Sequence, residues 1–226
     1  MAGQALPRIA HERSEVEKGR WRQTGAVNVQ SDDAAPSVLL IHGGLAEDIG
    51  AERFWVRPGI AAALEAIGWA VVAPDRNTTP SSWRAAAAEM AEFIEERSTV
   101  VAGSNGVSVA LQMALDRPEL VSRLVLLWPA TAGDDVVDQA VPARASHLLA
   151  GDTVRGITDA QLRDVQVPVA VMASEPENRV HSHQTVERLV DSITGAIRIN
   201  EEFPESPRPD FIGRLDAFVA VLAKHL

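Results

Sequence analysis

Short runs of apolar, largely β-branched residues recur along the chain and alternate with segments of helical periodicity. The runs that we interpret as strands are Ser37–Gly44, Gly68–Arg76, Ser98–Ser104, Ser122–Ala130, Val167–Ser174 and Ala196–Asn200. Because these runs are apolar throughout rather than alternately apolar and polar, both faces of each strand are expected to be covered, as in a parallel sheet. Alternation of such strands with helices predicts an α/β protein with a doubly wound, mostly parallel sheet.

Several of the intervening segments have the apolar spacing and boundary residues of helices. The predicted helices are Pro58–Ile67, Pro80–Arg97, Gly106–Asp116 and the segment that follows Pro209. A short antiparallel hairpin is predicted over Val16–Gly25, at one edge of the sheet.

The amino-acid composition limits which side chains can act as nucleophiles, acids, bases or metal ligands. The chain has 226 residues, no cysteine, no tyrosine, six histidines and a formal net charge of −10. This length suits a single domain over residues 1–226. The lack of cysteine excludes disulfides, thiolate–zinc sites and a cysteine nucleophile. Proton transfer therefore depends on serine, threonine, lysine, carboxylates or one of the few histidines.

Charge and hydropathy also limit the partners. Neutralising phosphates needs clustered Lys and Arg, so the acidic balance argues against a nucleic-acid surface. No apolar run reaches the roughly 18 residues of a membrane span. The first residues lack the apolar core of a secretory signal. We therefore expect a cytoplasmic protein that acts on a small-molecule substrate, with no nucleic-acid or membrane partner, no cofactor and no metal.

A serine stands between the third predicted strand and the helix that follows it, in the sequence Ala102-Gly103-Ser104-Asn105-Gly106. Small neighbours suit a sharp strand–turn–helix elbow that exposes a serine hydroxyl. The start of the helix supplies backbone N–H groups and a dipole that favour negative charge. Serine is also a common helix cap, so this motif alone leaves both interpretations open.

Two other segments add context: IHGG (Ile41–Gly44) ends the first strand, and VVAPDR ends the second. With the long segment AGSNGVSVALQMALDRPELVSRLVLLWPA, they resemble the α/β-hydrolase superfamily, and the resemblance extends from about Val16 to the C-terminus. It implies a sheet of the α/β-hydrolase type, Ser104 as nucleophile, and the amides of Gly44 and Asn105 as the oxyanion hole. Ala102 stands where the family usually has a glycine.

The sequence leaves open which residues transfer protons to and from Ser104. By resemblance, the acid follows the strand Val167–Ser174, where Glu177 stands, and the histidine follows the last strand, where the sequence has Glu202 instead. A base is needed to activate a serine. Four explanations stay open: Glu202 is the base, working with Glu177; His181 or His183 takes that role; the chemistry is not hydrolytic; or the protein only binds a ligand.

The residues between the fourth and fifth strands, 131–166, are predicted to form a small helical lid, with helices near 135–140, 142–149 and 158–163. Trp55, Trp128 and His147 are candidate pocket residues. The favoured function is an enzyme that acts on a small ester, lactone or thioester through Ser104, with Glu202, Glu177 or His181 as the base. The alternatives are a cofactor-independent lyase, cyclase or isomerase that uses Glu202, and a non-catalytic binding protein.

Overall fold

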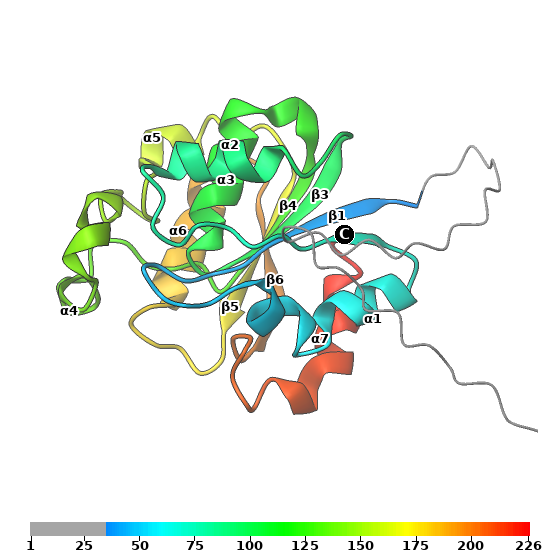
Figure 1. Cartoon of the computed structure of the whole chain (residues 1–226). Coiled ribbons are helices and arrows are strands. Elements are labelled where there is room, and N and C mark those ends of the chain that lie inside the picture. Colours follow the sequence, from blue (N-terminus) through cyan, green and yellow to red (C-terminus); the bar gives the residue numbers. More distant parts are fainter. Residues whose placement is uncertain (1–34) are drawn as a thin grey trace, which may run out of the picture. The chain divides into compact units, whose positions relative to one another are not determined.

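The computed structural model describes residues 35–226, so the predicted hairpin over 16–25 lies outside the described residues. Six parallel strands form one sheet in the order β2-β1-β3-β4-β5-β6 (Figure 1). The strands are β1 (Ser37–Ile41), β2 (Ala70–Val72), β3 (Ser98–Gly103), β4 (Val121–Leu127), β5 (Val169–Ser174) and β6 (Ile197–Phe203). The prediction of a doubly wound parallel sheet is confirmed, and each strand overlaps a predicted apolar run.

Helices cover both faces of the sheet (Figure 1). Two helices pack on one face and three on the other, because each places an apolar stripe against the strands. The first face carries α1 (Ile60–Ala66) and α7 (Leu215–Leu222). The second carries α2 (Trp83–Ala91), α3 (Gly106–Asp116) and α6 (His183–Ser192). None of the helices in residues 35–226 is long and apolar enough to cross a membrane.

Between β4 and β5 the chain forms a small lid of short helices. They are α4 (Asp135–Gln139), a 3-10 helix (Ala143–Leu148) and α5 (Asp159–Leu162), close to the three predicted positions. Asp134 and Thr158 cap α4 and α5 with their side chains, which explains why such short segments are helical.

Strand order decides where a ligand site lies. The chain runs outward from β1 to β2 and then returns to β3 on the other side of β1. In open α/β sheets, ligands bind outside the carboxyl ends of the strands at such a reversal. The ends of β1 and β3 hold the His-Gly-Gly turn and Ser104, so the topology brings the two predicted motifs together.

Candidate active site

Ser104 occupies a strained turn between β3 and α3. Its φ is +51°, in the left-handed region that non-glycine residues rarely adopt. Its amide donates to the carbonyl of Leu127 on β4 at 3.0 Å, and its carbonyl accepts from Val107 at 3.1 Å. Between residues 98 and 114, Ser104 alone is not buried. The turn therefore lifts one hydroxyl out of a buried strand and helix.

The glycines of this turn are required by close packing. A Cβ on Gly106 would lie 2.6 Å from the Ile41 carbonyl oxygen, and one on Gly103 would lie 2.6 Å from the Phe54 ring. A Cβ on Gly43 would lie 2.8 Å from the Cβ of Ser104. Contacts this short do not occur in real structures, so the elbow and the His-Gly-Gly turn depend on one another.

The Ser104 hydroxyl belongs to a chain of hydrogen bonds. Its Oγ lies 2.9 Å from Nε2 of His181, and Nδ1 of the same ring lies 2.8 Å from Oε1 of Glu205. The His181 side chain is mostly buried, as is that of Glu205. The structure thus brings together Ser104 and His181, which the sequence analysis named, with Glu205, which it did not.

Glu205 is held as a carboxylate. Its Oε1 also accepts from Ser174 Oγ and Asn178 Nδ2, both at 2.6 Å, and its Oε2 lies 3.5 Å from Arg208. Burial alone would raise the pKa of Glu205, but the hydrogen bonds from His181 and Ser174, with the charge of His181, outweigh it and lower the pKa to about 2.

The negative charge of Glu205 sets the tautomer of His181. An ionised carboxylate only accepts hydrogen bonds, so the proton on the ring lies at Nδ1, facing Glu205. The other ring nitrogen, Nε2, then carries a lone pair and accepts the hydrogen bond from the Ser104 hydroxyl. A histidine in this state can take the serine proton, which is the arrangement that an activated serine needs.

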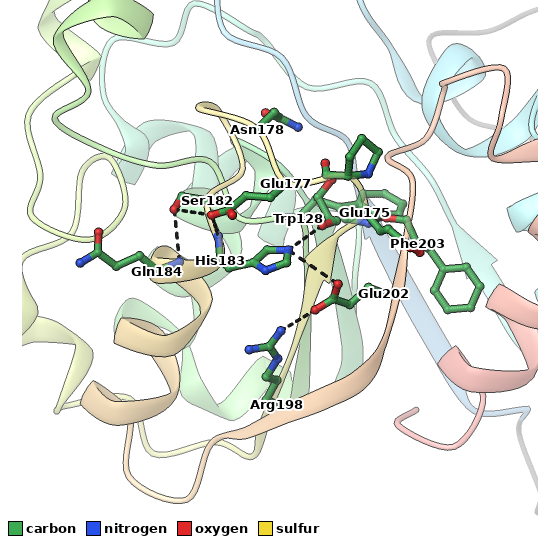
Figure 2. A network of polar contacts seen from close by, with 12 residues as sticks. Trp128, Glu175, Glu177, Asn178, Ser182, His183, Gln184, Arg198, Glu202 and Phe203 are labelled. Atoms are coloured by element: carbon green, nitrogen blue, oxygen red, sulfur yellow. Dashed lines mark hydrogen bonds and ion pairs between the residues drawn. The ribbon is translucent and has the colours of Figure 1, made fainter.

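Glu202 and Glu177 do not hydrogen-bond to Ser104 or His181, contrary to the expectation that they form a carboxylate dyad. Glu202 lies within β6 and pairs with Arg198, and its carboxylate is 3.7 Å from His183 (Figure 2). Glu177 accepts from the amide of His183 at 2.8 Å and from Ser182 Oγ at 3.1 Å, at the start of α6.

The same contacts explain why the pKa of Glu177 is lowered. The hydrogen bond from the His183 amide and that from Ser182 lower its pKa, so Glu177 stabilises the first turn of α6 as an anion. The His183 ring bonds elsewhere, since its Nε2 lies 2.8 Å from the carbonyl oxygen of Ser174. Of the two neighbouring histidines, His181 therefore faces the serine.

The predicted pocket residues Trp55 and Trp128 lie in the core instead. Both are fully buried. Trp128 stacks on Phe218 with ring centroids 5.7 Å apart and donates to the carbonyl of Phe203 at 2.9 Å. Its φ is +49°, at the turn that follows β4. His147 is exposed, and its ring bonds to the Pro80 carbonyl at 2.9 Å.

A buried cation fixes the turn that carries Gly44. The guanidinium of Arg76 donates to the carbonyl oxygens of His42, Gly43 and Gly44. The His42 ring accepts from the Arg76 amide at 2.9 Å, and burial together with the Arg76 charge lowers the pKa of His42 to about 4. Neutral His42 thus supports the turn. Within residues 35–226, the amides of Gly44 and Asn105 donate to no protein acceptor, as an oxyanion hole requires.

A cleft of about 460 Å³ lies next to this turn. It is lined by Leu45, Ala46 and Glu47, by the aliphatic lid residues between 136 and 142, and by Asn105, Arg155 and Val180. A separate, more polar hollow of about 560 Å³ contains Glu177 and the start of α6. No three His, Asp or Glu side chains in residues 35–226 are grouped so as to hold a metal ion.

Several solved structures are similar to this chain. The putative non-heme bromoperoxidase BpoC from Mycobacterium tuberculosis H37Rv matches with a TM-score of 0.63 at 16% identity, over 91% of this chain and 98% of that one. MGS-MChE2, an α/β hydrolase enzyme from the metagenome of lagoon sediments from Mar Chica, Morocco, matches with a TM-score of 0.61 at 15% identity, over 84% and 90%. The chain has the α/β-hydrolase fold.

A third α/β-hydrolase-fold structure, the meta-cleavage product hydrolase from Pseudomonas fluorescens IP01, has a TM-score of 0.62 at 18% identity, over 84% of this chain and 90% of that one. No protein-family model matches the sequence, and no curated protein matches it either. The similarity therefore establishes the fold, and the chemistry has to be argued from the site.

The site differs in one respect from the α/β-hydrolase arrangement that the resemblance implies. The loop after β5, expected to carry the acid, carries His181, and the loop after β6, expected to carry the histidine, carries Glu205. The two strands are adjacent and parallel, and Ser174 pairs with Phe203 at their carboxyl ends. Either loop can thus reach Ser104, and the positions of the histidine and the carboxylate are exchanged.

Glu205 was not predicted because the resemblance places the family's histidine position at Glu202, seven residues before Pro209, and because the predicted last strand ends before both glutamates. The prediction stopped at Asn200, whereas β6 continues to Phe203. Glu202 therefore lies within the strand and Glu205 is the first glutamate beyond it. The available signal was the proline at 204, which cannot donate to a strand ladder and so favours a strand end just before Glu205.

Proposed function

We propose that this protein is a serine hydrolase that cleaves a small ester, lactone or thioester through an acyl-enzyme on Ser104. The observation that carries the proposal is the hydrogen-bonded chain from Ser104 Oγ through both nitrogens of His181 to Glu205, with distances of 2.9 and 2.8 Å. Together with the strained turn at Ser104, this chain fits the roles of nucleophile, base and orienting acid.

The reaction follows from these positions. His181 Nε2 takes the hydroxyl proton as Ser104 Oγ attacks the carbonyl carbon, and Glu205 stabilises the imidazolium that forms. The amides of Gly44 and Asn105 receive the negative charge that develops on the carbonyl oxygen. His181 then gives its proton to the leaving alcohol or thiol. His181 then deprotonates a water molecule that attacks the acyl carbon, the bond to Ser104 Oγ breaks, and His181 returns the proton to Ser104 as the acid is released.

The cleft offers an aliphatic wall on the lid side to an acyl or alkyl group. Its lining includes one aliphatic run of the lid, Val136, Val137, Ala140, Val141 and Pro142, and also the charged residues Glu47 and Arg155. The volume of about 460 Å³ is within the range of small-molecule pockets. This supports substrates of small size, in keeping with the short lid.

The alternative lyase, cyclase or isomerase with Glu202 as base is less well supported, because the Glu202 carboxylate is paired with Arg198 and stands beside His183 (Figure 2). The hydrogen bonds that link Ser104, His181 and Glu205 suit hydrolysis, so they do not support the alternative of a protein that only binds a ligand.

Labelling with a fluorophosphonate probe tests the proposal. The intact protein should be labelled on the peptide that contains Ser104, and Ser104→Ala should lose both labelling and turnover of short-chain p-nitrophenyl esters. The binding site should survive this substitution, since it removes only one oxygen. A protein that resists labelling, or a Ser104→Ala variant that keeps its turnover, would show that the proposal is wrong.

A further inference from the structure

Arg155 is a buried cation of the lid that no step of the proposed reaction uses. Its side chain is 2% exposed. Nη1 donates to Oδ1 of Asn105 at 2.8 Å, and Nη2 donates to Oδ1 of Asp138 in α4 at 2.9 Å. A buried ion pair adds little to stability compared with apolar residues of the same size, because both charges lose their hydration. A function other than stability would explain this residue.

The partner of Arg155 is the residue that follows the nucleophile. Asn105 stands at the N-cap of α3, and its amide is one of the two assigned to the oxyanion hole. Asparagine is among the best capping residues, yet its side chain makes no cap hydrogen bond here. Its oxygen instead accepts from Arg155, and the residue is buried. The side chain is thus held by the lid and not by its own helix.

Arg155 is itself held by rigid packing. The next residue, Gly156, has a φ of +78°, and a Cβ there would lie 2.0 Å from Cδ1 of Trp83. The Trp83 ring, at the start of α2, donates to the Leu148 carbonyl at 2.9 Å. Val154, on the other side, forms backbone bridges with Thr131 and with Ile157 of the same loop. The guanidinium is therefore presented to Asn105 from a backbone that has little freedom to move.

The hydrogen bonding of the Arg155 guanidinium is incomplete, which is unfavourable for the stability of the fold. Nε of Arg155 is buried and has no hydrogen-bond partner among residues 35–226, and an unsatisfied buried donor destabilises the fold. The side chain nevertheless reaches both Asn105 and Asp138. What it accomplishes is to connect α4 of the lid to the residue whose amide faces the reacting oxygen.

We propose that Arg155 is a positioning residue: it holds Asn105 so that the backbone amide of that residue points at the developing oxyanion. The inference rests on the proposed serine hydrolase function and adds to it a lid residue that completes the catalytic geometry. Loss of one oxyanion donor costs roughly 10²–10³ in rate, and a misplacement of about 1 Å costs roughly 10². Because the amide remains in the variants, we expect losses of about 10- to 100-fold.

The test compares Arg155→Met, Asn105→Ala and the double variant by kcat, KM and the rate of Ser104 labelling with a fluorophosphonate. Each single variant should lower kcat and the labelling rate by about 10- to 100-fold, with KM changed by less than about threefold. The double variant should lose no more than either single one, since both break the same contact. Arg155→Lys should recover part of the loss.

Arg188→Met is the matched control. Arg188 also pairs with a lid carboxylate, Asp159 at 3.5 Å, but it is half exposed and does not touch Asn105. It should leave kcat and labelling unchanged. Thermal unfolding of every variant shows which of them are folded. If Arg155→Met does not fold, Asn105→Ala alone decides, because it removes only the acceptor.

Two results overturn the inference. A folded Arg155→Met or Asn105→Ala that is labelled and turns over at the wild-type rate excludes a positioning role. Losses that add in the double variant show two independent effects. Both results require a wild-type protein that is labelled, so they differ from failure of the proposed function, in which the wild-type protein itself is not labelled at Ser104.

Discussion

Replacing Glu205 by glutamine tests the proposed chemistry most directly. The substitution keeps the shape of the side chain and removes its charge. Three donors, from His181, Ser174 and Asn178, converge on Oε1, so the amide oxygen of glutamine should take that position and its NH2 group the position near Arg208. The tautomer of His181 is then preserved, and what is lost is the negative charge beside the ring.

The size of the expected loss of activity in Glu205→Gln follows from the pKa of Glu205. A pKa of about 2, against an ordinary value of 4.5, corresponds to about 3 kcal/mol of stabilisation of the anion in the folded protein. Solvent near the Glu205 carboxylate screens part of this interaction, so about 3 kcal/mol is an upper value. Only the part of this value that comes from His181 acts on the imidazolium of the transition state, and about 3 kcal/mol, equivalent to roughly 10²-fold in rate, is what the full value would give. We therefore expect kcat/KM to fall by up to about 10²-fold.

Unfolding by urea provides a second measurement. At pH 7 the Glu205→Gln variant should be less stable than the wild-type protein by about 3 kcal/mol at most. Because folding lowers the pKa of Glu205, its contribution is complete above pH 4.5 and is lost as the pH falls towards about 2. The difference between the two proteins should thus shrink over that range.

Glu202→Gln is the control for both measurements, since Glu202 lies on the same strand and pairs with Arg198 rather than with His181. It should change kcat/KM by less than about threefold. The reasoning is refuted if Glu205→Gln retains wild-type activity, or if Glu202→Gln is the variant that loses it.

Three further substitutions, two of them paired with a control variant, extend these tests. His181→Gln should lower kcat/KM by at least about 10³-fold, whereas His183→Gln, two residues away, should change it little; ester hydrolysis measures both. Gly106→Ala should destabilise the protein by about 1–3 kcal/mol because its methyl group meets the carbonyl at the end of β1, whereas Gly213→Ala, with open space around it, should be neutral in thermal unfolding. Arg76→Met removes a donor from the carbonyl oxygens of His42, Gly43 and Gly44, so both the melting temperature and the rate of fluorophosphonate labelling should fall. An unchanged labelling rate would mean that this arginine does not support the oxyanion turn.

The sequence was sufficient for the strands and for the serine elbow. Apolar runs without alternation predict strands covered on both faces, and six strands appear where such runs occur. The predicted helix over Gly106–Asp116 matches α3 at both ends. These features depend on neighbours close in the sequence, such as the glycines on either side of Ser104, and therefore a local pattern is enough to predict them.

The tertiary structure decided the partners of Ser104. His181 and Glu205 lie 77 and 101 positions beyond it in the numbering, on loops that meet only because β5 and β6 are adjacent and parallel. The segment EEFPE contains three glutamates, and the end of β6 determines which of them leaves the sheet. Local propensity cannot fix such a boundary to within the two or three residues that separate Glu202 from Glu205. Nor can it show that Trp128 turns into the core, since that direction is set by packing against residues far along the chain.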